Sequence, residues 1–317
     1  MTYNDIDIHL LMLRDRIRTE GYKRAIEAVV KPGDRVLDFG CGTGILSFFA
    51  ARAGASAVYA VDRSPMIRTA QELAKANGIS GIRFFKGEGG AVELPTKVDV
   101  IVSEFMGHFV FHEQMLPPLL DLRDKWLADG GVVIPSRVGL YASLVGDQGG
   151  AKERGFFRKP QYGVDYTMVA DWPFFETTTG ALEPDQLVFD PVLLADLDLR
   201  SMSAQPETLR GEITPSGDAT VFALCGWFDT ELADGIGFGT GPSDPPTHWA
   251  QIVFPLVRPF CARAGRPIRI AFSPTRQGKP EGTVWRWSIA DDADEIEMDD
   301  FVVRSWAARP VPDGWLP

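Results

Sequence analysis

Cysteine is scarce in this chain. Among its 317 residues only Cys41, Cys225 and Cys261 occur, and they lie far apart in the sequence. A disulfide framework or a zinc site needs more cysteines at closer spacing, so the sequence indicates neither. We expect no metal site.

Long apolar runs are also missing. No stretch of 18 apolar residues occurs, so we expect no membrane-spanning segment. The first residues, MTYNDIDIHLLMLRDRIRTEG, place acids and bases between the apolar positions, which is not the pattern of a signal peptide. Together these absences predict a cytoplasmic protein without a membrane partner.

Positive charge is in deficit as well. The formal net charge is −11 and the isoelectric point is about 4.9. A general nucleic-acid binder needs a basic surface to displace counterions, so we expect no nucleic-acid partner. The charge suits a cationic substrate, although many soluble proteins are acidic without one. Hydrophobic residues make up 45% of the chain, which is enough for a packed core.

Residues 1–140 alternate strand and helix signals. Buried strands are predicted at 35–40, 57–62, at IRFFKG and VDVIVSE, and finally at VVIPSR. Helices are predicted at 45–54, from the Ser64–Pro65 cap to Ala76, and within QMLPPLLDLRDKWLADGG, ending at its glycines. This alternation is typical of a doubly wound parallel α/β sheet.

After about residue 140 the pattern changes. Short alternating runs such as VGLYASLV, TVFALCGWF and TVWRWSI are separated by Gly, Pro and Asp turns. They predict an antiparallel β sandwich or barrel. We place the boundary near Pro135.

The stretch LDFGCGTGI follows the first strand and opens a helix. It resembles the dinucleotide fingerprint, but Ile45 stands where the third glycine of that motif belongs. Gly40 and Gly42 still allow close approach of a ligand to the backbone, and Asp62 ends the second strand, where an acid can accept hydrogen bonds from a ribose diol. A nucleoside without a pyrophosphate fits these features, so we favour S-adenosylmethionine; NAD and a purely structural turn are the alternatives.

The segment SEFMGHFVFHEQM brackets a mostly apolar loop with two glutamates. Glu104 follows the fourth strand, at the sheet edge where ligands of open α/β folds bind, and Glu113 comes just before the next helix. Two converging carboxylates need a cation, and a guanidinium pairs with carboxylates through a fixed fork of donors. The alternative is a pair of solvated loop acids.

The same loop resembles the double-glutamate loop of the protein arginine methyltransferases. MLRDRIRT, VLDFGCGTGILSFFAARAGA, VELPTKVDVIVSE and the THW at 247–249 resemble further motifs of that family, in the same order over about residues 3 to 275. The resemblance implies a Rossmann-like class I methyltransferase domain with an N-terminal lid helix at 1–135. An antiparallel β-barrel substrate domain at 136–317 would follow.

The resemblance also implies roles. Glu104 and Glu113 would clamp the guanidinium, and His248, paired with Asp15, would close the pocket; a purely structural histidine is the alternative. The expected cofactor-binding residues are Met12, Arg18, Asp38, Gly40, Gly42, Asp62 and Glu88. The expected substrate-pocket residues are Tyr3, Met106, Met115 and Trp249, and Met12 and Met115 would limit how many methyl groups fit.

Some positions depart from the family pattern. The lid helix is expected to be nearly absent, because the chain starts two residues before Tyr3. Phe105 replaces a tryptophan, and His108 and His112 replace tyrosines. A glutamate that reaches adenine in the family falls at Gly90, where Glu88 could substitute. These departures affect the expected substrate pocket rather than the reaction.

We therefore predict an S-adenosylmethionine-dependent arginine N-methyltransferase. Its substrate is free L-arginine or a small guanidine, which we slightly favour, or else arginine in a protein. The alternative is a non-catalytic partner of an active methyltransferase. A homodimer is also expected, because residues 154–178 are rich in aromatic residues and fall where the family has its dimerisation arm; an ordinary loop folded on the barrel is the other interpretation.

Overall fold

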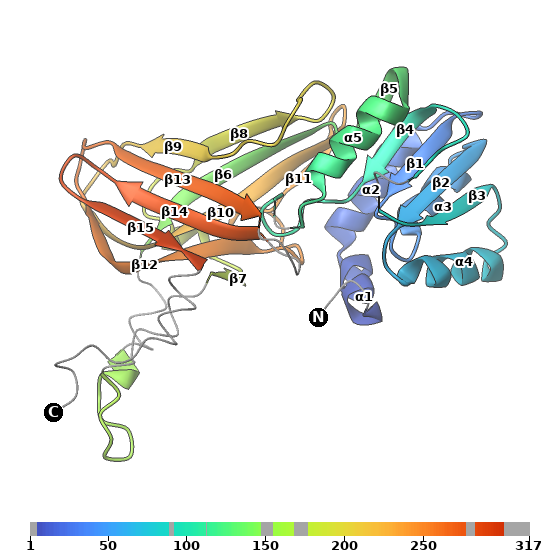
Figure 1. Ribbon diagram of the computed structural model, residues 1–317. Coiled ribbons are helices and arrows are strands. Elements are labelled where there is room, and N and C mark those ends of the chain that lie inside the picture. Colours follow the sequence, from blue (N-terminus) through green and yellow to red (C-terminus); the bar gives the residue numbers. More distant parts are fainter. Residues whose placement is uncertain are drawn as a thin grey trace.

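The computed structural model describes residues 5–88, 92–111, 113–146, 155–167, 177–276 and 283–300. Helices and a parallel sheet occupy one end of an elongated molecule, and antiparallel sheets occupy the other (Figure 1). The expected residues Tyr3, Gly90 and His112 lie outside the described part, as do the tryptophan and phenylalanines at 172–175.

The parallel sheet has the strand order β3-β2-β1-β4-β5. Its strands are β1 (Arg35–Phe39), β2 (Ala57–Asp62), β3 (Ile82–Lys86), β4 (Val98–Ser103) and β5 (Leu127–Ile134). Val36 in β1 pairs with Val58 of β2 on one side and Val100 of β4 on the other. The strands β1, β2 and β4 are buried almost throughout, which is expected when helices cover both faces of a parallel sheet.

Within the described ranges, five helices accompany this sheet. They are α1 (Ile6–Arg14), α2 (Arg16–Val29), α3 (Ile45–Arg52), α4 (Met66–Ala76) and α5 (Leu116–Trp126). Asp15 caps α2, because its carboxylate accepts a hydrogen bond from the Arg18 amide. The Ser64 hydroxyl accepts a bond from the Met66 amide, so α4 starts within a residue of the predicted position.

The end of α5 differs from the prediction. We expected the helix to run to the glycines of LADGG, but it stops at Trp126 and β5 begins at once. β5 contains Gly130, whose φ of 75° suits glycine, and its pairing with β4 shifts register between Val98 and Val100. Hydrogen bonding to β4 thus makes residues 127–131 part of β5, although their glycines are a local signal for the end of a helix.

The antiparallel half contains two hydrogen-bonded sheets. One has the order β7-β12-β10-β6-β8 with β11 paired to β10, and the other has the order β15-β14-β13-β9. The strands are β6 (Arg137–Val145), β7 (Thr178–Gly180), β8 (Val192–Asp198), β9 (Leu209–Ile213), β10 (Ala219–Ala233), β11 (Ile236–Gly239), β12 (Gln251–Ala262), β13 (Ile268–Arg276), β14 (Thr283–Ala290) and β15 (Glu295–Asp299). The short helix η4 (Pro184–Gln186) precedes β8.

The predicted fold class is confirmed: a Rossmann-like parallel α/β half is followed by an antiparallel β half. Within the described ranges the ladders of the second half do not close into one continuous ring. The helices of the described ranges include none that is both long and apolar enough to cross a membrane.

The loop between the two glutamates is a core element that joins the halves. Phe105, Phe109 and Phe111 are completely buried. The Phe109 ring lies 5.3 Å from the Trp285 ring and 5.9 Å from the Phe254 ring, centroid to centroid. A Cβ on Gly226 would lie 2.7 Å from Phe109, so β10 has a glycine where this ring enters. The aromatic residues of the loop therefore pack into the antiparallel half.

Candidate active site

The site lies at the carboxyl edge of the parallel sheet. The strand order places β1 beside β4, and the chain leaves these two strands in the glycine loop and in the double-glutamate loop. This is the topological switch point at which open α/β sheets bind ligands. Asp62, the last residue of β2, reaches the same edge.

The glycine loop approaches other elements too closely for side chains. Gly40 and Gly42 have φ values of 78° and 53°. A Cβ on Gly40 would lie 2.7 Å from Cε of Met115, and one on Gly42 would lie 2.8 Å from Cε1 of His9. Glycine at these two positions therefore lets His9 of α1 and Met115, the residue before α5, pack closely against the loop.

Asp62 shapes this loop. Its Oδ2 accepts a hydrogen bond from the Gly42 amide and its Oδ1 accepts one from the Ser64 amide, both at 2.7 Å. The carboxylate therefore fixes the glycine loop against the start of α4. Each oxygen retains acceptor capacity for a hydroxyl or amine of a bound nucleoside.

Asp38 is completely buried beneath the loop. The Ser47 hydroxyl donates to its Oδ2 at 2.5 Å, whereas Oδ1 is buried without a partner among the described residues. Burial raises the pKa of Asp38 to about 7, although the Ser47 bonds oppose the shift. An unsatisfied buried acceptor beneath the glycine loop fits a cofactor that carries hydrogen-bond donors.

Glu104 holds a guanidinium in this structure. Its Oε2 accepts hydrogen bonds from Nε and Nη2 of Arg18 at 3.2 and 3.0 Å, and its Oε1 accepts one from the Met106 amide. The two side chains are 10% and 6% exposed, so water screens the pair poorly. We expected these residues to have separate partners, and the structure brings them together.

Glu113 folds back over the same loop. Its Oε1 lies 3.0 Å from the position that a Cβ on Gly107 would take, and Gly107 has a φ of 45°. A side chain at 107 would push Glu113 away. The glycine in the middle of the loop therefore lets the second glutamate approach the segment that follows the first.

His248 and Asp15 join the two halves. The Asp15 Oδ2 accepts hydrogen bonds from the backbone amide and from Nδ1 of His248 at 2.9 and 2.7 Å, while its Oδ1 caps α2. Burial alone would raise the pKa of Asp15, but the bonds from His248 and the Arg18 amide hold it below its usual value. With Nδ1–H donating a hydrogen bond to the Asp15 carboxylate, Nε2 is the ring nitrogen that can accept a proton.

Comparison with known proteins identifies the family. Residues 136–304 match the arginine methyltransferase oligomerization subdomain, and residues 19–138 match the ribosomal protein L11 methyltransferase (PrmA) model. Protein arginine N-methyltransferase 1.1 of Arabidopsis thaliana is 38% identical over 266 residues, which cover 80% of this chain and 68% of the relative. This chain belongs to the protein arginine N-methyltransferase family.

Further relatives agree. Protein arginine N-methyltransferase 1 of Schizosaccharomyces pombe is 35% identical over 84% of this chain and 82% of its own. The Trypanosoma brucei PRMT1 enzyme-prozyme heterotetrameric complex with AdoHcy has a TM-score of 0.82 at 30% identity, covering 94% and 99% of the two chains. The predicted family, the predicted arginine methyltransferase activity and S-adenosylmethionine as cofactor are confirmed.

The remaining predicted site residues of this arginine methyltransferase are dispersed around these contacts. Met106 is completely buried and its Sδ lies 3.7 Å from the Tyr22 hydroxyl. Trp249 is 2% exposed and stacks on Phe238. Met12 lies on α1, half-buried. The Glu88 side chain is 74% exposed, with its Oε1 4.0 Å from Arg63, which is a weak position for holding adenine.

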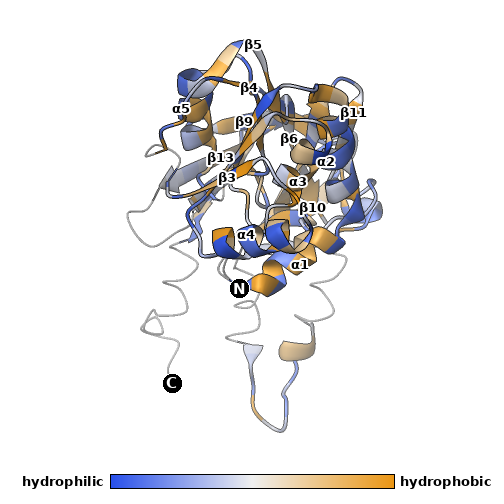
Figure 2. Cartoon of the chain, turned by 90° about the vertical axis from the view of Figure 1, so that its right-hand side faces the viewer, coloured by the Kyte–Doolittle hydropathy of each residue, from blue (hydrophilic) through white to orange (hydrophobic). Residues whose placement is uncertain are grey.

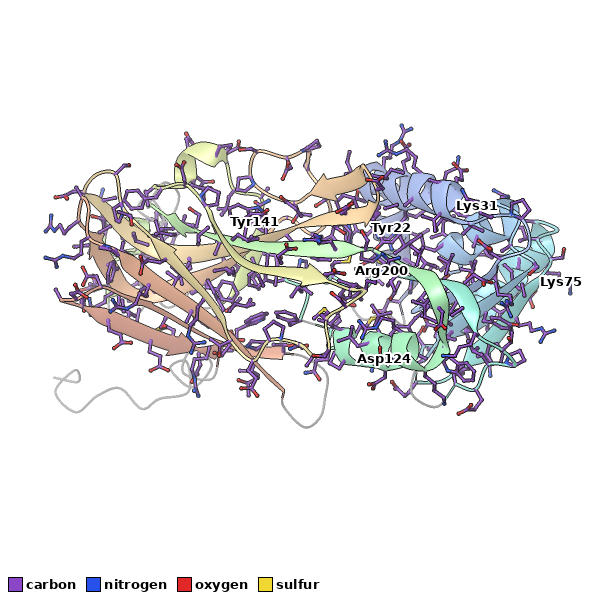
Figure 3. All side chains as sticks on the ribbon, turned by 90° about the horizontal axis from the view of Figure 1, so that it is seen from above. Tyr22, Lys31, Lys75, Asp124, Tyr141 and Arg200 are labelled. Carbon is purple, nitrogen blue, oxygen red and sulfur yellow. The ribbon has the colours of Figure 1, made fainter. Side chains whose placement is uncertain are left out.

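Sequence reasoning missed two residues. His9 is buried against Gly42; the signal was a lone histidine on an otherwise apolar helix. Tyr22 is buried at the junction of the halves (Figure 3), where its hydroxyl donates to the Ser103 carbonyl. His108, noted as a departure, has its Nδ1 2.9 Å from the Trp249 carbonyl, and burial lowers its pKa.

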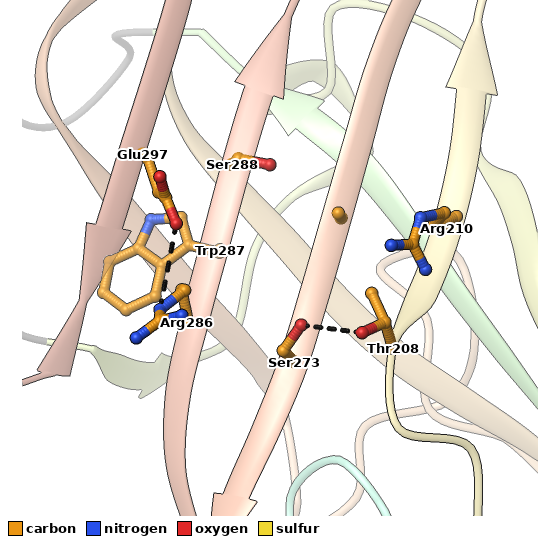
Figure 4. A pocket seen from close by; sticks show the side chains of 8 residues that line it. Thr208, Arg210, Ser273, Arg286, Trp287, Ser288 and Glu297 are labelled. Carbon is orange, nitrogen blue, oxygen red and sulfur yellow. Dashed lines mark hydrogen bonds and ion pairs between the residues drawn. The ribbon is translucent and has the colours of Figure 1, made fainter.

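A hollow on the outer face of the four-stranded sheet lies away from this chemistry. Figure 4 shows Arg210, Ser273 and Arg286 among its lining residues, with Arg286 paired to Glu297. None of the predicted site residues lines it. The candidate active site of this methyltransferase therefore lies at the edge of the parallel sheet, and this hollow is a separate surface feature.

Proposed function

We propose that this chain transfers the methyl group of S-adenosylmethionine to a guanidino nitrogen of arginine within a protein. The main support is that the Arg18 guanidinium pairs with Glu104 close to the glycine loop. The Glu104 carboxylate is thus positioned to bind a guanidinium next to the proposed cofactor site. The names of the relatives, which specify protein arginine, support a protein substrate, and our slight preference for free L-arginine is given up.

The cofactor would lie on the glycine loop. Gly40 and Gly42 admit it, Asp62 and the unpartnered Oδ1 of Asp38 offer acceptors, and Arg18 can pair with a carboxylate. When bound, S-adenosylmethionine supplies an electrophilic methyl group. Met12 would lie against it, and Glu88 is the weakest of the proposed contacts because of its exposure.

Glu104 and Glu113 would prepare the nucleophile. Guanidinium nitrogens share their lone pairs with the π system, so each is a poor nucleophile. Two carboxylates would draw positive charge towards the other nitrogens and hold the remaining one in line with the methyl group. Arg18 would exchange its place on Glu104 for the cofactor as the substrate guanidinium enters.

A proton must leave the nitrogen with or after methyl transfer. A guanidinium has a pKa above about 12, so prior deprotonation is unfavourable. Glu113 is one acceptor. Nε2 of His248 is the other, since Nδ1 keeps its own proton and donates a hydrogen bond to Asp15. Tyr3, Met106, Met115 and Trp249 complete the proposed substrate pocket.

We also propose a homodimer in the cytoplasm, with a methyltransferase domain at 1–135 and a substrate domain at 136–317. Support comes from the match to an oligomerization subdomain and from exposed apolar side chains. On α1 these are Ile6, Leu10, Leu11 and Leu13, and in the proposed arm they are Phe156, Tyr162, Val164 and Tyr166. Figure 2 shows the apolar colouring of α1 at the surface. Light scattering that shows a fully active monomer would contradict this assembly.

The activity is tested by mass spectrometry after incubation with S-adenosylmethionine and either an arginine–glycine peptide or free L-arginine. We expect mass increments of one or more methyl groups on the peptide and none on the amino acid. The Glu104→Gln variant, which keeps the shape of the side chain, serves as the inactive control. Methylation of free arginine alone would contradict the substrate, and methylation of neither would contradict the function.

A further inference from the structure

Two aspartates face each other across Gly239, outside the site described above. Asp229 lies in β10 and pairs in register with Gly239 of β11. A Cβ on Gly239 would lie 2.8 Å from Oδ1 of Asp229 and 2.2 Å from Oδ2 of Asp244. The two oxygens are therefore within about 5 Å of each other, and only glycine leaves room for both carboxyl groups.

The environment of Asp229 disfavours a second negative charge. Its Oδ1 is buried without a hydrogen-bond partner among the described residues. The titratable and charged residues around Asp229 are Arg137 and Tyr141 of β6, Asp196 of β8, and Glu231 of the same strand, β10. Arg137 is already paired with Asp196 at 2.6 Å. Figure 3 labels Tyr141 in the antiparallel half.

The pKa of Asp229 follows from this environment. Burial, and then the charge of Asp244, raise it to about 6. Two carboxyl groups close enough to repel lose their last proton at a higher pH than an isolated aspartate does. Asp229 therefore changes charge near pH 6.

Asp244 belongs to the loop that carries His248. The loop begins at Thr240, whose hydroxyl bonds to both backbone groups of Phe228, and it ends at Gln251, whose Nε2 donates to the Thr240 carbonyl. Between these ends the Gly241 amide donates to Oδ2 of Asp244 at 2.9 Å. His248 then reaches Asp15 in the other half. Movement of Asp244 relative to β10 is thus movement of the segment that places His248.

We propose that Asp229 and Asp244 share one proton and, as a positioning pair, hold the 240–248 loop and its His248 over the substrate pocket. With the proton present, one carboxyl donates to the other and the loop stays on β10. When it is lost, two carboxylates repel and the loop moves outward. Asp229 has a raised pKa in the folded protein. The stabilisation of the loop by its proton is therefore complete below pH about 4 and is lost as the pH rises through about 6.

The test compares Asp229→Asn with the wild-type enzyme. Asparagine keeps the shape and donates a hydrogen bond to Asp244 at every pH. We expect the ratio of kcat/KM, variant over wild type, to be near one at pH 5.5 and to rise about five- to tenfold by pH 8. The ratio cancels other titrating groups that both proteins share. Asp244→Asn should behave in the same way.

Asp196→Asn is the matched control, because Asp196 lies on the same face but is paired with Arg137. Its ratio should not change with pH. A flat ratio for Asp229→Asn would overturn the proposal.

A second measurement is independent of turnover, which matters because the kinetic test rests on the proposed function. Carboxyl-carbon NMR of the wild-type protein should show a step near pH 6 for Asp229 or Asp244, and the Gly241 amide should exchange faster above that step than its intrinsic pH dependence requires. Titration of both aspartates near pH 4 would refute the shared proton even if the enzyme methylates arginine. If the step is present but no arginine is methylated, only the proposed function fails.

Discussion

The two halves of the molecule build the site in different ways. In the parallel half two carboxylates of the candidate site lie at strand ends and are held by backbone amides: Asp62 by Gly42 and Ser64, and Glu104 by Met106. In the antiparallel half His248 is placed by Asp15, which is 233 residues away in the sequence. The first contacts lie within the parallel half, whereas the second forms only when the two halves are docked.

The largest expected effect concerns the parallel half. Glu104→Gln should lower kcat by at least about a hundredfold, the scale of one removed electrostatic stabiliser, because glutamine keeps the shape but not the charge. Folding should persist, as judged by circular dichroism. Glu113→Gln is expected to behave alike, and Glu93→Gln, at an exposed pair with Lys125, is the control. Near-normal turnover in Glu104→Gln would remove that residue from the mechanism.

The next effect concerns Asp38, the buried acid of the parallel half. Asp38 has a folded pKa of about 7, above its unfolded value. Its contribution is complete below pH about 4 and is lost as the pH rises, so the wild-type free energy of unfolding should drop by about 2–3 kcal/mol between pH 5 and 7 relative to Asp38→Asn.

Urea denaturation at several pH values measures this difference. The control is Ser47→Ala, which removes the hydroxyl that stabilises the ionised form. It should raise the pKa of Asp38 further and extend the drop to higher pH. Parallel stability curves for wild type and Asp38→Asn would show that Asp38 titrates normally.

The third prediction concerns the His248–Asp15 hydrogen bond, which links the two halves. His248→Ala should lower kcat/KM about tenfold and the free energy of unfolding by about 1–2 kcal/mol, because Asp15 loses a charge-assisted bond. The pKa of Asp15 is depressed, so this contribution is present above pH about 4 and is lost as the pH falls. The stability difference should therefore shrink as the pH falls below about 4. A difference that does not change with pH over this range would assign it to packing.

The smallest effect tests the glycine loop. Gly42→Ala adds a Cβ 2.8 Å from His9 at a φ of 53°, whereas Gly81→Ala adds one in open space at a φ of 81°. Both should lose about 1 kcal/mol of stability through backbone strain. Only Gly42→Ala should also weaken S-adenosylmethionine binding, by calorimetry. Equal affinities in the two variants would mean that close approach at Gly42 is not needed.

Much of the parallel half was predictable because its signals are local. Short apolar runs and the turns between them predict all five strands of the parallel sheet and the glycine loop. They also place Asp62 and Glu104 at strand ends. The end of α5 was predicted wrongly, since pairing with β4 overrides local helix-stop signals at the glycines. Pairing partners distant in sequence decide such boundaries.

The sequence by itself determined the fold class, the family motifs and which residue types gather at the sheet edge. Only the tertiary structure decided that the aromatic residues of the double-glutamate loop are core, that Arg18 lies on Glu104, that His9 lies on Gly42, and that Asp229 faces Asp244. The reason is physical. Strand and turn patterns arise from interactions between near neighbours, whereas these contacts form only when packing of the two halves brings distant segments within a few ångströms.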